Sequence, residues 1–352
     1  MVLDSLYALY NLDKSAKCLL RGVVESIGTS QRMVATSNLS LICKVYVQGI
    51  NVSNHRIGLN KVWELLHVDR GSSSNICTVG HRVAHGGEAL TKPALVTDSV
   101  KQAIGEAVPL APLHNPTNLE GIKAAEELIK CPQVAVFDTS FHSTLPPYAY
   151  MYALPLTLYK ELGVRRYGFH GTSYQFVLDE SASLLRKSKD SLNIIICHLG
   201  AGASMAAIRE GKCIDTTMDL GVFQIGDKDM RVVWDAAKAG SEKHKLAVDI
   251  FVHRIRKYLG AYLVHLEGKV DALVFTAGIG ENSVPIRSMV CQGFDAFGIS
   301  LDEKKNNQDA KEKREIQSAD SKIKVLVVPT DEELCIAQQT LQVLSTIKSK
   351  TG

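Results

Sequence analysis

The sequence lacks several features that mark large classes of protein. Its eight cysteines include no C-x-x-C pair, which argues against both a zinc site and a disulfide framework. Its net charge is only +3 and its Lys and Arg residues are scattered, which argues against nucleic acid as a partner. No apolar run is long enough to cross a bilayer, and the first residues do not resemble a secretory signal. These absences predict a protein of the reducing cytoplasm that binds neither nucleic acid nor a membrane, with an organelle left open.

The common nucleotide-binding motifs are also absent. No G-x-x-x-x-G-K-[ST] string occurs, so a P-loop is excluded. Two G-x-G strings, at Gly200–Gly202 and Gly278–Gly280, follow apolar runs, but neither completes the G-x-G-x-x-G of a Rossmann site. Glycine at such a turn still lets backbone N–H groups approach phosphate oxygens that a side chain would block. The two turns therefore fit a phosphate-bearing ligand bound in some other way.

The sequence does contain four short apolar runs that each stop at a polar or glycine-rich turn. Such runs are typical of the buried strands of an α/β sheet. Ligands of open α/β sheets bind beyond the carboxyl ends of the strands, where these turns would lie. Because 352 residues exceed the usual size of a single core, two domains are expected. The predicted strands are Gln133–Phe137, Asn193–Cys197, Ala272–Thr276 and Lys324–Val328.

The rest of the chain supports a coarser prediction. Apolar residues at helical spacing predict one long helix over Val232–Leu266, which contains no proline. The charged segment 302–322 predicts a solvated excursion before the last strand. The aromatic, proline-bounded segment Tyr148–Pro155 fits a crossing between domains. Further helices are expected over 54–67, Thr97–Val108 and Asn118–Lys130.

Ionisable side chains recur in turns bounded by apolar residues or glycine. Arg82 stands between two histidines and near two glycines, and a guanidinium suits bidentate capture of a carboxylate or phosphate. His114, Asp138 and His170 occupy three comparable turns further along the chain. Burial of such groups costs free energy unless a partner or a ligand compensates. One such residue is more often part of an ordinary ion pair or core, but four of them predict a site.

Seven strings in this order strongly resemble the acetate kinase family. They are GHRVAHGGE, APLHNPTNLEGI, VAVFDTSFHSTLPPYAYMYALP, GVRRYGFHGTSY, HLGAGAS, DALVFTAGIGENS and VVPTDEELCIA. The resemblance implies the acetate and sugar kinase, Hsp70 and actin superfamily, an α/β fold whose two RNase H-like, actin-like ATPase domains enclose a nucleotide cleft. The first domain would comprise residues 1–147 plus 333–352, and the second, nucleotide-binding domain residues 148–332. The implied enzyme is a homodimer that reversibly transfers the γ-phosphoryl of ATP to acetate, with Mg²⁺, to give acetyl phosphate.

The resemblance also implies roles for individual residues, motif by motif. Asp138 would be the catalytic carboxylate, and Arg82 would be a catalytic ligand of acetate or of the phosphoryl group. His170 would donate a hydrogen bond to the transferring phosphoryl group, with His114 as a supporting polar contact to the substrate. These roles suit phosphoryl transfer, in which catalysis is mostly positioning and the neutralisation of charge.

The resemblance assigns cofactor sites as well. Glu332 would hold the magnesium ion, in preference to its neighbour Glu333. Two glycine-rich turns and a short D-[FM]-R segment would bind the nucleotide. Their residues are His198, Leu199, Gly200, Ala201 and Gly202, then Asp229, Met230 and Arg231, then Gly278, Ile279, Gly280, Glu281 and Asn282.

Two family segments have no counterpart in this sequence. The family opens on a strand that ends in N-x-G-S-S-S-x-K, whereas here Tyr7 stands where the lysine would be and Gly71–Ser74 is interpreted as a loop. Family members also carry G-T-R-x-G-D-I-D-P, with a transition-state arginine, where this chain has only Leu220–Lys228 between Asp219 and Asp229. Loss of such an arginine typically lowers the rate by several powers of ten.

Three hypotheses stay open on the sequence alone. The leading one is an acetate kinase. The second is a non-catalytic nucleotide-binding or dimerising relative, which the missing segments favour. The third is a kinase for propionate or butyrate, because the choice among short carboxylates depends on the volume of a small apolar pocket.

Overall fold

The structure is a computed structural model of the chain that describes residues 3–11, 17–27, 33–38, 43–48, 57, 76–218, 220 and 229–351. It divides into two compact units. The first unit consists of Met1–Ser140 and Glu332–Gly352, and the second of Phe141–Asp331. The helix predicted over 54–67 lies outside the described residues except for Ile57, which is helical. The predicted loop at residues 71–74 and the side chain of Tyr7 lie outside them too.

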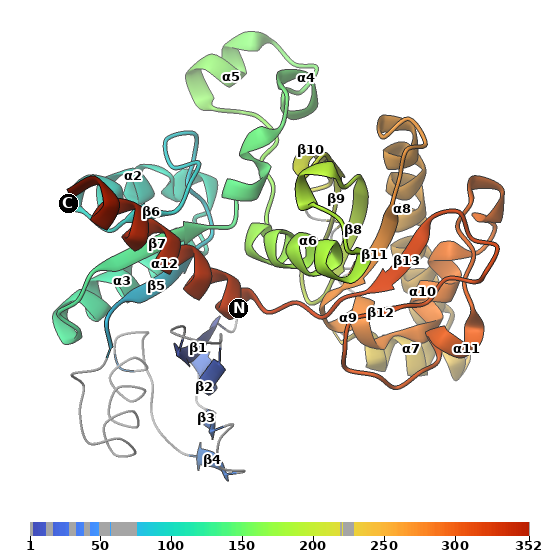
Figure 1. Ribbon diagram of the computed structural model, residues 1–352, viewed down its shortest axis with the longest axis horizontal. Coiled ribbons are helices and arrows are strands. Elements are labelled where there is room, and N and C mark those ends of the chain that lie inside the picture. The colour runs from blue at the N-terminus through green and yellow to red at the C-terminus, as the bar shows by residue number, and fades with distance from the viewer. Residues whose placement is uncertain are drawn as a thin grey trace. The chain divides into compact units, whose positions relative to one another are not determined.

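The described strands of the first unit form two sheets (Figure 1). One is antiparallel and follows chain order through β1 (Leu3–Asn11), β2 (Lys17–Ile27), β3 (Met33–Asn38) and β4 (Cys43–Gln48). The other has the order β5-β7-β6 and comprises β5 (Val79–Val83), β6 (Ala94–Leu95) and β7 (Gln133–Phe137). No ladder between described strands joins the two sheets. Because β5 and β7 are parallel neighbours, their carboxyl ends lie together.

In the described part of the first unit, three α-helices follow the helical Ile57: α2 (Asp98–Glu106), α3 (Asn115–Leu128) and α12 (Glu332–Thr351). The helix predicted from Thr97 is confirmed, and the Thr97 side chain caps it by accepting a hydrogen bond from the Val100 N–H. Helix α3 begins at Asn115, earlier than the predicted Asn118. The reason is that Pro116 fits in the first helical turn, where its missing N–H removes no hydrogen bond.

Gly80 in β5 lies so close to α12 that a side chain does not fit. A Cβ at Gly80 would lie 2.4 Å from Thr340 Oγ1 and 2.8 Å from Ile336 Cγ2. We therefore expect Gly80→Ala to lower the free energy of unfolding by about 1–3 kcal/mol, measured by urea denaturation.

Gly121→Ala is the matched control in α3, because no atom lies within 4 Å of the added Cβ. Alanine is the better helix former, so this change should raise stability by about 0.5–1 kcal/mol. Similar effects of the two substitutions would contradict close packing of α12 on β5.

The second unit is built on a six-stranded sheet with the order β10-β9-β8-β11-β13-β12. The three central strands are parallel and the others are antiparallel to their neighbours. The strands are β8 (Ile194–Leu199), β9 (Ala203–Arg209), β10 (Lys212–Thr216), β11 (Ala272–Thr276), β12 (Arg314–Glu315) and β13 (Lys324–Val327). All four strands predicted from apolar runs are confirmed, as β7, β8, β11 and β13.

Helices pack against the central strands of this sheet from both sides. In β8, Ile195 and Cys197 belong to one apolar cluster, which includes Phe251 and other residues of α8 (Glu242–His265). Ile194 and Ile196 belong to a second cluster, formed with α6 (Gly171–Leu185). A strand that is covered on both faces needs apolar side chains at every position, which explains the continuous runs.

The remaining helices of the second unit are shorter. None of the described helices has the length and apolar character of a membrane span. The shorter helices of the second unit are α4 (Pro147–Tyr150), α5 (Leu156–Leu162), α7 (Met230–Lys238), α9 (Ala277–Asn282), α10 (Val284–Cys291) and α11 (Glu303–Asn306).

The prediction of one long helix over Val232–Leu266 is wrong, because the segment forms two helices, α7 and α8. The chain breaks at Gly240, whose φ of +92° is incompatible with a right-handed helix. The predicted inward face is nevertheless present in α8, where Phe251, Ile255 and Leu259 are buried.

The prediction that segment 302–322 is a solvated excursion is only partly right, because most of its residues are exposed but a few are buried. The segment contains α11 and the edge strand β12, and both Asn306 and Ile316 are fully buried. The sequence did not reveal these two buried positions, because the composition of the segment is dominated by charged side chains that face water.

Candidate active site

Arg82 and Asp138 come together because β5 and β7 are parallel neighbours. In this ladder Arg82 is level with Val136, and Val83 is level with Phe137. Asp138 follows β7 directly, and its N–H donates to the Val83 carbonyl at 3.0 Å. Arg82 and Asp138 therefore lie at the carboxyl edge of this sheet, as expected for ligand-binding residues of α/β proteins.

The Arg82–Asp138 pair has a forked geometry. Arg82 Nε donates to Asp138 Oδ1 and Oδ2 at 3.2 and 3.1 Å, and Arg82 Nη2 donates to Oδ2 at 2.6 Å. The Asp138 side chain is 1% exposed, whereas that of Arg82 is 52% exposed. The Asp138 charge raises the pKa of Arg82, so the guanidinium stays protonated. Among the described residues, Arg82 Nη1 has no acceptor, which leaves it available for an anion.

His114 and Glu332 lie in the electrostatic field of this pair. His114 is exposed, and partial desolvation together with the positive charge of Arg82 lowers its pKa, against the opposite effect of Asp138. Glu332 and Glu333 begin α12, and both carboxylates help to raise the pKa of Arg82. The structure thus brings four predicted site residues of the first unit into one neighbourhood.

Asn115 holds the loop that follows β5, a role that the motifs did not reveal. This fully buried side chain accepts from the His85 N–H at 3.1 Å and donates to the His85 carbonyl at 2.9 Å. It also donates to the Ile104 carbonyl at 3.2 Å. Asn115 thereby fixes the backbone just beyond Arg82, and its place inside the string APLHNPTNLEGI was the only signal for it.

The two glycine-rich segments of the second unit lie beside each other, and the second of them, predicted as a turn, is the first turn of the short helix α9, called here the second glycine turn. β8 and β11 are parallel, with His198 level with Thr276 at their carboxyl ends. A Cβ at Gly200 would lie 3.3 Å from the Ala277 Cβ, so the Gly200–Gly202 turn approaches the start of α9 closely. Ala201 and Gly278 are exposed, whereas Leu199 is buried in the core and could offer a ligand only its backbone.

His170 stacks on His198 at these turns. Their ring centroids lie 4.2 Å apart, with 13° between the planes. His170 has a φ of +58°, which is rare for a residue with a Cβ, and its Nδ1 is bonded to Ser204 Oγ at 2.8 Å. A Cβ at Gly202 would lie only 2.8 Å from His170 Nε2, so this position admits only glycine beside the ring.

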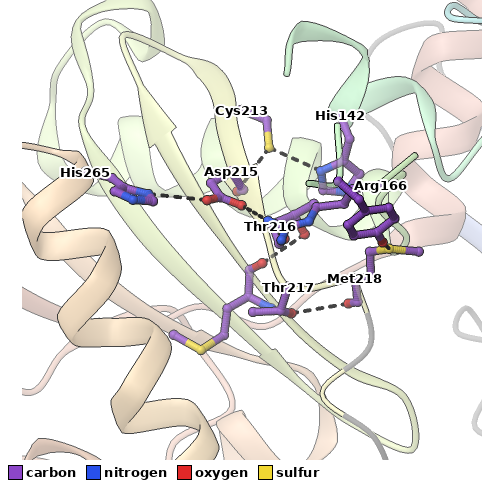
Figure 2. Close-up of polar contacts among 10 residues, drawn as sticks. His142, Arg166, Cys213, Asp215, Thr216, Thr217, Met218 and His265 are labelled. Carbon is purple, nitrogen blue, oxygen red and sulfur yellow. Dashed lines mark hydrogen bonds and ion pairs between the residues drawn. The ribbon is translucent and has the colours of Figure 1, made fainter. Parts of the chain in front are cut away.

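His142 supports the backbone immediately before His170. Its Nε2 donates to the Phe169 carbonyl at 2.9 Å, and a Cβ at Gly168 would lie 2.3 Å from the imidazole ring. Figure 2 shows His142 pointing toward Cys213, whose Sγ lies 3.2 Å from His142 Nδ1. Burial raises the pKa of Cys213, so it is a neutral thiol whose single S–H has two acceptors within reach, this nitrogen and the Asp215 carbonyl at 3.4 Å. His142 is therefore a support for the His170 loop.

Arg166 ties the same loop to the end of β10. Its Nη1 lies 2.5 Å from Asp215 Oδ1 and donates to the Thr216 carbonyl at 3.1 Å. His265, at the end of α8, meets the other carboxylate oxygen of Asp215 at 3.3 Å (Figure 2). Three distant segments of the chain are thus joined where β10 ends.

Arg287 was missed entirely by the sequence motifs. It lies in α10 with no exposed surface and donates to the carbonyls of Gly280 and Glu281 at 2.9 and 2.8 Å. It also donates to the Asn306 side chain at 2.7 Å and to its carbonyl at 2.9 Å. Desolvation lowers the pKa of Arg287 to about 10. A buried charge thus anchors the second glycine turn, and Glu281 is fixed further by the Thr330 N–H at 3.2 Å.

Asp229 and Arg231 pair with each other at the start of α7. Arg231 Nη2 donates to Asp229 Oδ2 at 2.6 Å, and the pair lowers the pKa of Asp229 to about 2. The Arg231 side chain is 88% exposed. Met230, between them, packs against the apolar cluster under α8.

A sequence profile of the Acetokinase family matches residues 5–224 and 220–338, which is most of the chain. The chain belongs to the Acetokinase family. It is 41% identical to acetate kinase from Oleidesulfovibrio alaskensis, over 96% of both chains. The acetate kinase structure from Porphyromonas gingivalis matches 97% of both chains at 34% identity and a TM-score of 0.87. A propionate kinase structure from Francisella tularensis matches equally well, at 32% identity and 0.87.

These relatives confirm the fold class predicted from the sequence, α/β with two RNase H-like domains of the actin-like ATPase kind. The comparisons also bear on the two family segments that have no counterpart in this sequence. The two profile matches meet at residues 220–224, inside the predicted gap before Asp229. The alignment with the O. alaskensis enzyme spans 389 positions, 37 more than the 352 residues of this chain, so at least that many positions of the relative have no counterpart here.

Proposed function

We propose that this member of the Acetokinase family is an acetate kinase, which transfers the γ-phosphoryl of ATP to acetate and catalyses the reverse reaction. The observation that carries the proposal is the Arg82–Asp138 pair. Its guanidinium is half exposed, is oriented by a buried carboxylate and keeps an Nη1 without an acceptor among the described residues. Such a group suits bidentate recognition of a small anion.

Acetate, the acceptor of the phosphoryl group, needs no general base. A simple carboxylic acid is ionised at neutral pH, so acetate is already a nucleophile. Asp138 accordingly acts by orienting Arg82 and by adding negative charge where a metal ion is needed. Arg82 acts by holding acetate or the transferring phosphoryl group and neutralising the charge that develops on its oxygens.

The transfer conserves atoms and charge as a direct displacement. A bond forms between one acetate oxygen and the γ-phosphorus of ATP, and the bond from that phosphorus to the β–γ bridging oxygen breaks. The electron pair of the broken bond stays on ADP, and acetyl phosphate is the other product. His170 donates a hydrogen bond to the equatorial oxygens of the phosphoryl group during this step.

We assign ATP binding to the glycine turns of the second unit. Two features of Gly200–Gly202 and Gly278–Gly280 support this assignment. A Cβ at Gly278 would meet no atom within 4 Å, so the backbone there is open to a ligand. The turns also follow adjacent parallel strands, where backbone N–H groups can approach phosphate oxygens.

We assign Mg²⁺ to Glu332. In the part of the chain that the structure describes, no cluster of three or more His, Cys, Asp or Glu side chains forms a ready-made metal site. Mg²⁺ in kinases is commonly held by one or two carboxylates together with substrate phosphates, and Glu332 near Arg82 and Asp138 fits that need. When bound, the ion would neutralise phosphate charge.

A non-catalytic nucleotide-binding protein is the second candidate, and the interrupted family match favours it. The two profile matches meet in the segment where the resemblance places the transition-state arginine. Ground-state binding and transition-state stabilisation can be lost separately. We therefore expect ATP binding to persist while the turnover of acetate falls far below that of an uninterrupted relative.

One preparation can separate the two candidates. Calorimetry with ATP and Mg²⁺ measures binding, and a coupled assay of ADP release with acetate, propionate and butyrate measures turnover. Binding with slow, acetate-dependent release supports an impaired acetate kinase. Binding without any carboxylate-dependent release supports the non-catalytic candidate. Full turnover would contradict the interpretation of the interrupted segment, and faster release with propionate or butyrate would reassign the substrate.

Three narrower statements stay proposals. A homodimer is implied by the resemblance and can be checked by sedimentation equilibrium. A cytoplasmic location follows from the sequence prediction and can be checked by cell fractionation. The domain boundaries at residues 147 and 333 can be checked by limited proteolysis.

A further inference from the structure

Behind His170 a short chain of hydroxyl groups is sealed from water. Ser204 Oγ lies 2.8 Å from His170 Nδ1 and 2.6 Å from the Tyr174 hydroxyl. Ser204 and Tyr174 have no exposed surface. Phe141 and His142 pack against the Tyr174 ring, with centroids 5.8 and 5.4 Å away.

The hydroxyl hydrogens of Tyr174 and Ser204 can be placed by elimination. Within the described residues, Ser204 Oγ is the only hydrogen-bond partner of the Tyr174 hydroxyl. A buried O–H without an acceptor is costly, so the Tyr174 proton lies toward Ser204 Oγ. Burial raises the pKa of Tyr174 well above its ordinary value, which keeps this proton on the phenol. Among the described residues, the Ser204 proton then has one remaining acceptor, Nδ1 of His170.

We propose that Tyr174 and Ser204 are positioning residues that hold His170 as the neutral tautomer with its proton on Nε2. A neutral imidazole carries one N–H, so a donor at Nδ1 leaves the proton on Nε2. Nε2 is the nitrogen beside Gly202, where a Cβ would lie 2.8 Å away. The hydrogen-bonded series Tyr174–Ser204–His170, called here the relay, thus directs an N–H toward the Gly200–Gly202 turn. The use of that N–H on a phosphoryl oxygen rests on the proposed function.

Nitrogen-15 NMR of the imidazole groups tests the tautomer without any need for activity. The His170 signals can be assigned from a His170→Gln sample. At neutral pH we expect the wild-type pattern of an Nε2–H tautomer, with Nδ1 as the unprotonated nitrogen. Ser204→Ala removes the donor to Nδ1, and we expect the signals to shift toward a mixture of tautomers.

Two matched controls are present in the same unit. Ser181 lies in α6, and its buried Oγ has no hydrogen-bond partner among the described residues. The buried Tyr262 hydroxyl of α8 likewise has none among them. Ser181→Ala and Tyr262→Phe repeat the chemical changes of Ser204→Ala and Tyr174→Phe away from His170. We expect both controls to leave the His170 signals unchanged.

Kinetics give the second readout. Ser204→Ala should lower kcat for acetate by about tenfold or more with little change in KM, because a misaligned donor weakens the transition state more than the ground state. Tyr174→Phe should have a smaller effect, and the controls should stay within about twofold of wild type.

The outcomes separate this proposal from the proposed function. A wild-type signal from an Nδ1–H tautomer or from a doubly protonated His170 would overturn the relay. Equal shifts in the control variants would show that the signals report general loosening of the core, which also overturns it. An Nε2–H pattern that depends on Ser204, in a chain without kinase activity, would uphold the relay and reject the kinase assignment.

Discussion

Replacing Asp138 with Asn is expected to lower acetate-dependent ADP release by about 10³-fold. The Asp138 carboxylate accepts from both Nε and Nη2 of Arg82, and an amide can offer only one oxygen to this fork. The guanidinium would lose its orientation, and the loss of one such preorganised donor typically lowers the rate by about 10²–10³-fold. Steady-state kinetics of the purified variant gives the measurement.

The same substitution should change the melting temperature little. The Arg82 side chain is 52% exposed, so water can solvate its charge when the carboxylate is gone, and no unpaired ion is left buried. Glu126→Gln is the control, because it breaks the 2.9 Å ion pair with Lys101 in the same unit and should leave turnover unchanged. Normal turnover of Asp138→Asn would remove Asp138 from the mechanism.

The strands could be predicted from the sequence because their signal is local. A strand covered on both faces must be apolar throughout, and β7, β8, β11 and β13 carry that pattern in consecutive residues. The break at Gly240 was missed because the apolar spacing on both sides of it continues to fit one helix.

The charged segment 302–322 was hard to predict because its buried contacts are not local in sequence. Its composition is dominated by residues that face water, whereas its structural role depends on Asn306, which is buried against Arg287. The two partners are 19 residues apart, and neither spacing nor charge links them. Contacts of this kind arise only when the chain folds, so a pattern within one segment cannot show them.

The candidate site likewise contains residues that the sequence revealed and supporting residues that it did not. Arg82, Asp138, His114 and His170 were found because ionisable residues in apolar turns are conspicuous. Their supports were not, because a buried Asn115 or Ser204 looks in sequence like any small polar residue. The resemblance to a family supplied roles for conspicuous residues and said nothing about the hydrogen bonds that hold them.

Replacing Arg287 with Met is expected to remove most ATP binding and to destabilise the second unit by about 3–5 kcal/mol. Arg287 is the donor for the carbonyls of Gly280 and Glu281 and for two oxygens of Asn306, and methionine would leave these acceptors unpaired in a dry interior. The turn that begins at Gly278 would then lose its anchor. Thermal unfolding measures the first effect, and calorimetric titration with ATP well below the melting temperature measures the second, for which we expect at least a tenfold weaker affinity.

Arg256→Met separates loss of this anchor from general loosening of the unit. Arg256 also donates to helix-terminal carbonyls, those of Met289 and Val290 at 3.0 and 3.2 Å, but these belong to α10 and lie away from the glycine turns. Arg256 is partly exposed, so water can replace it, and the loss of stability should be only about 1 kcal/mol with ATP affinity unchanged. If both variants lost ATP affinity equally, the effect of Arg287 would be one of overall stability. If neither lost it, the second glycine turn would not depend on Arg287 for binding, and the anchoring role derived from the four hydrogen bonds would be wrong.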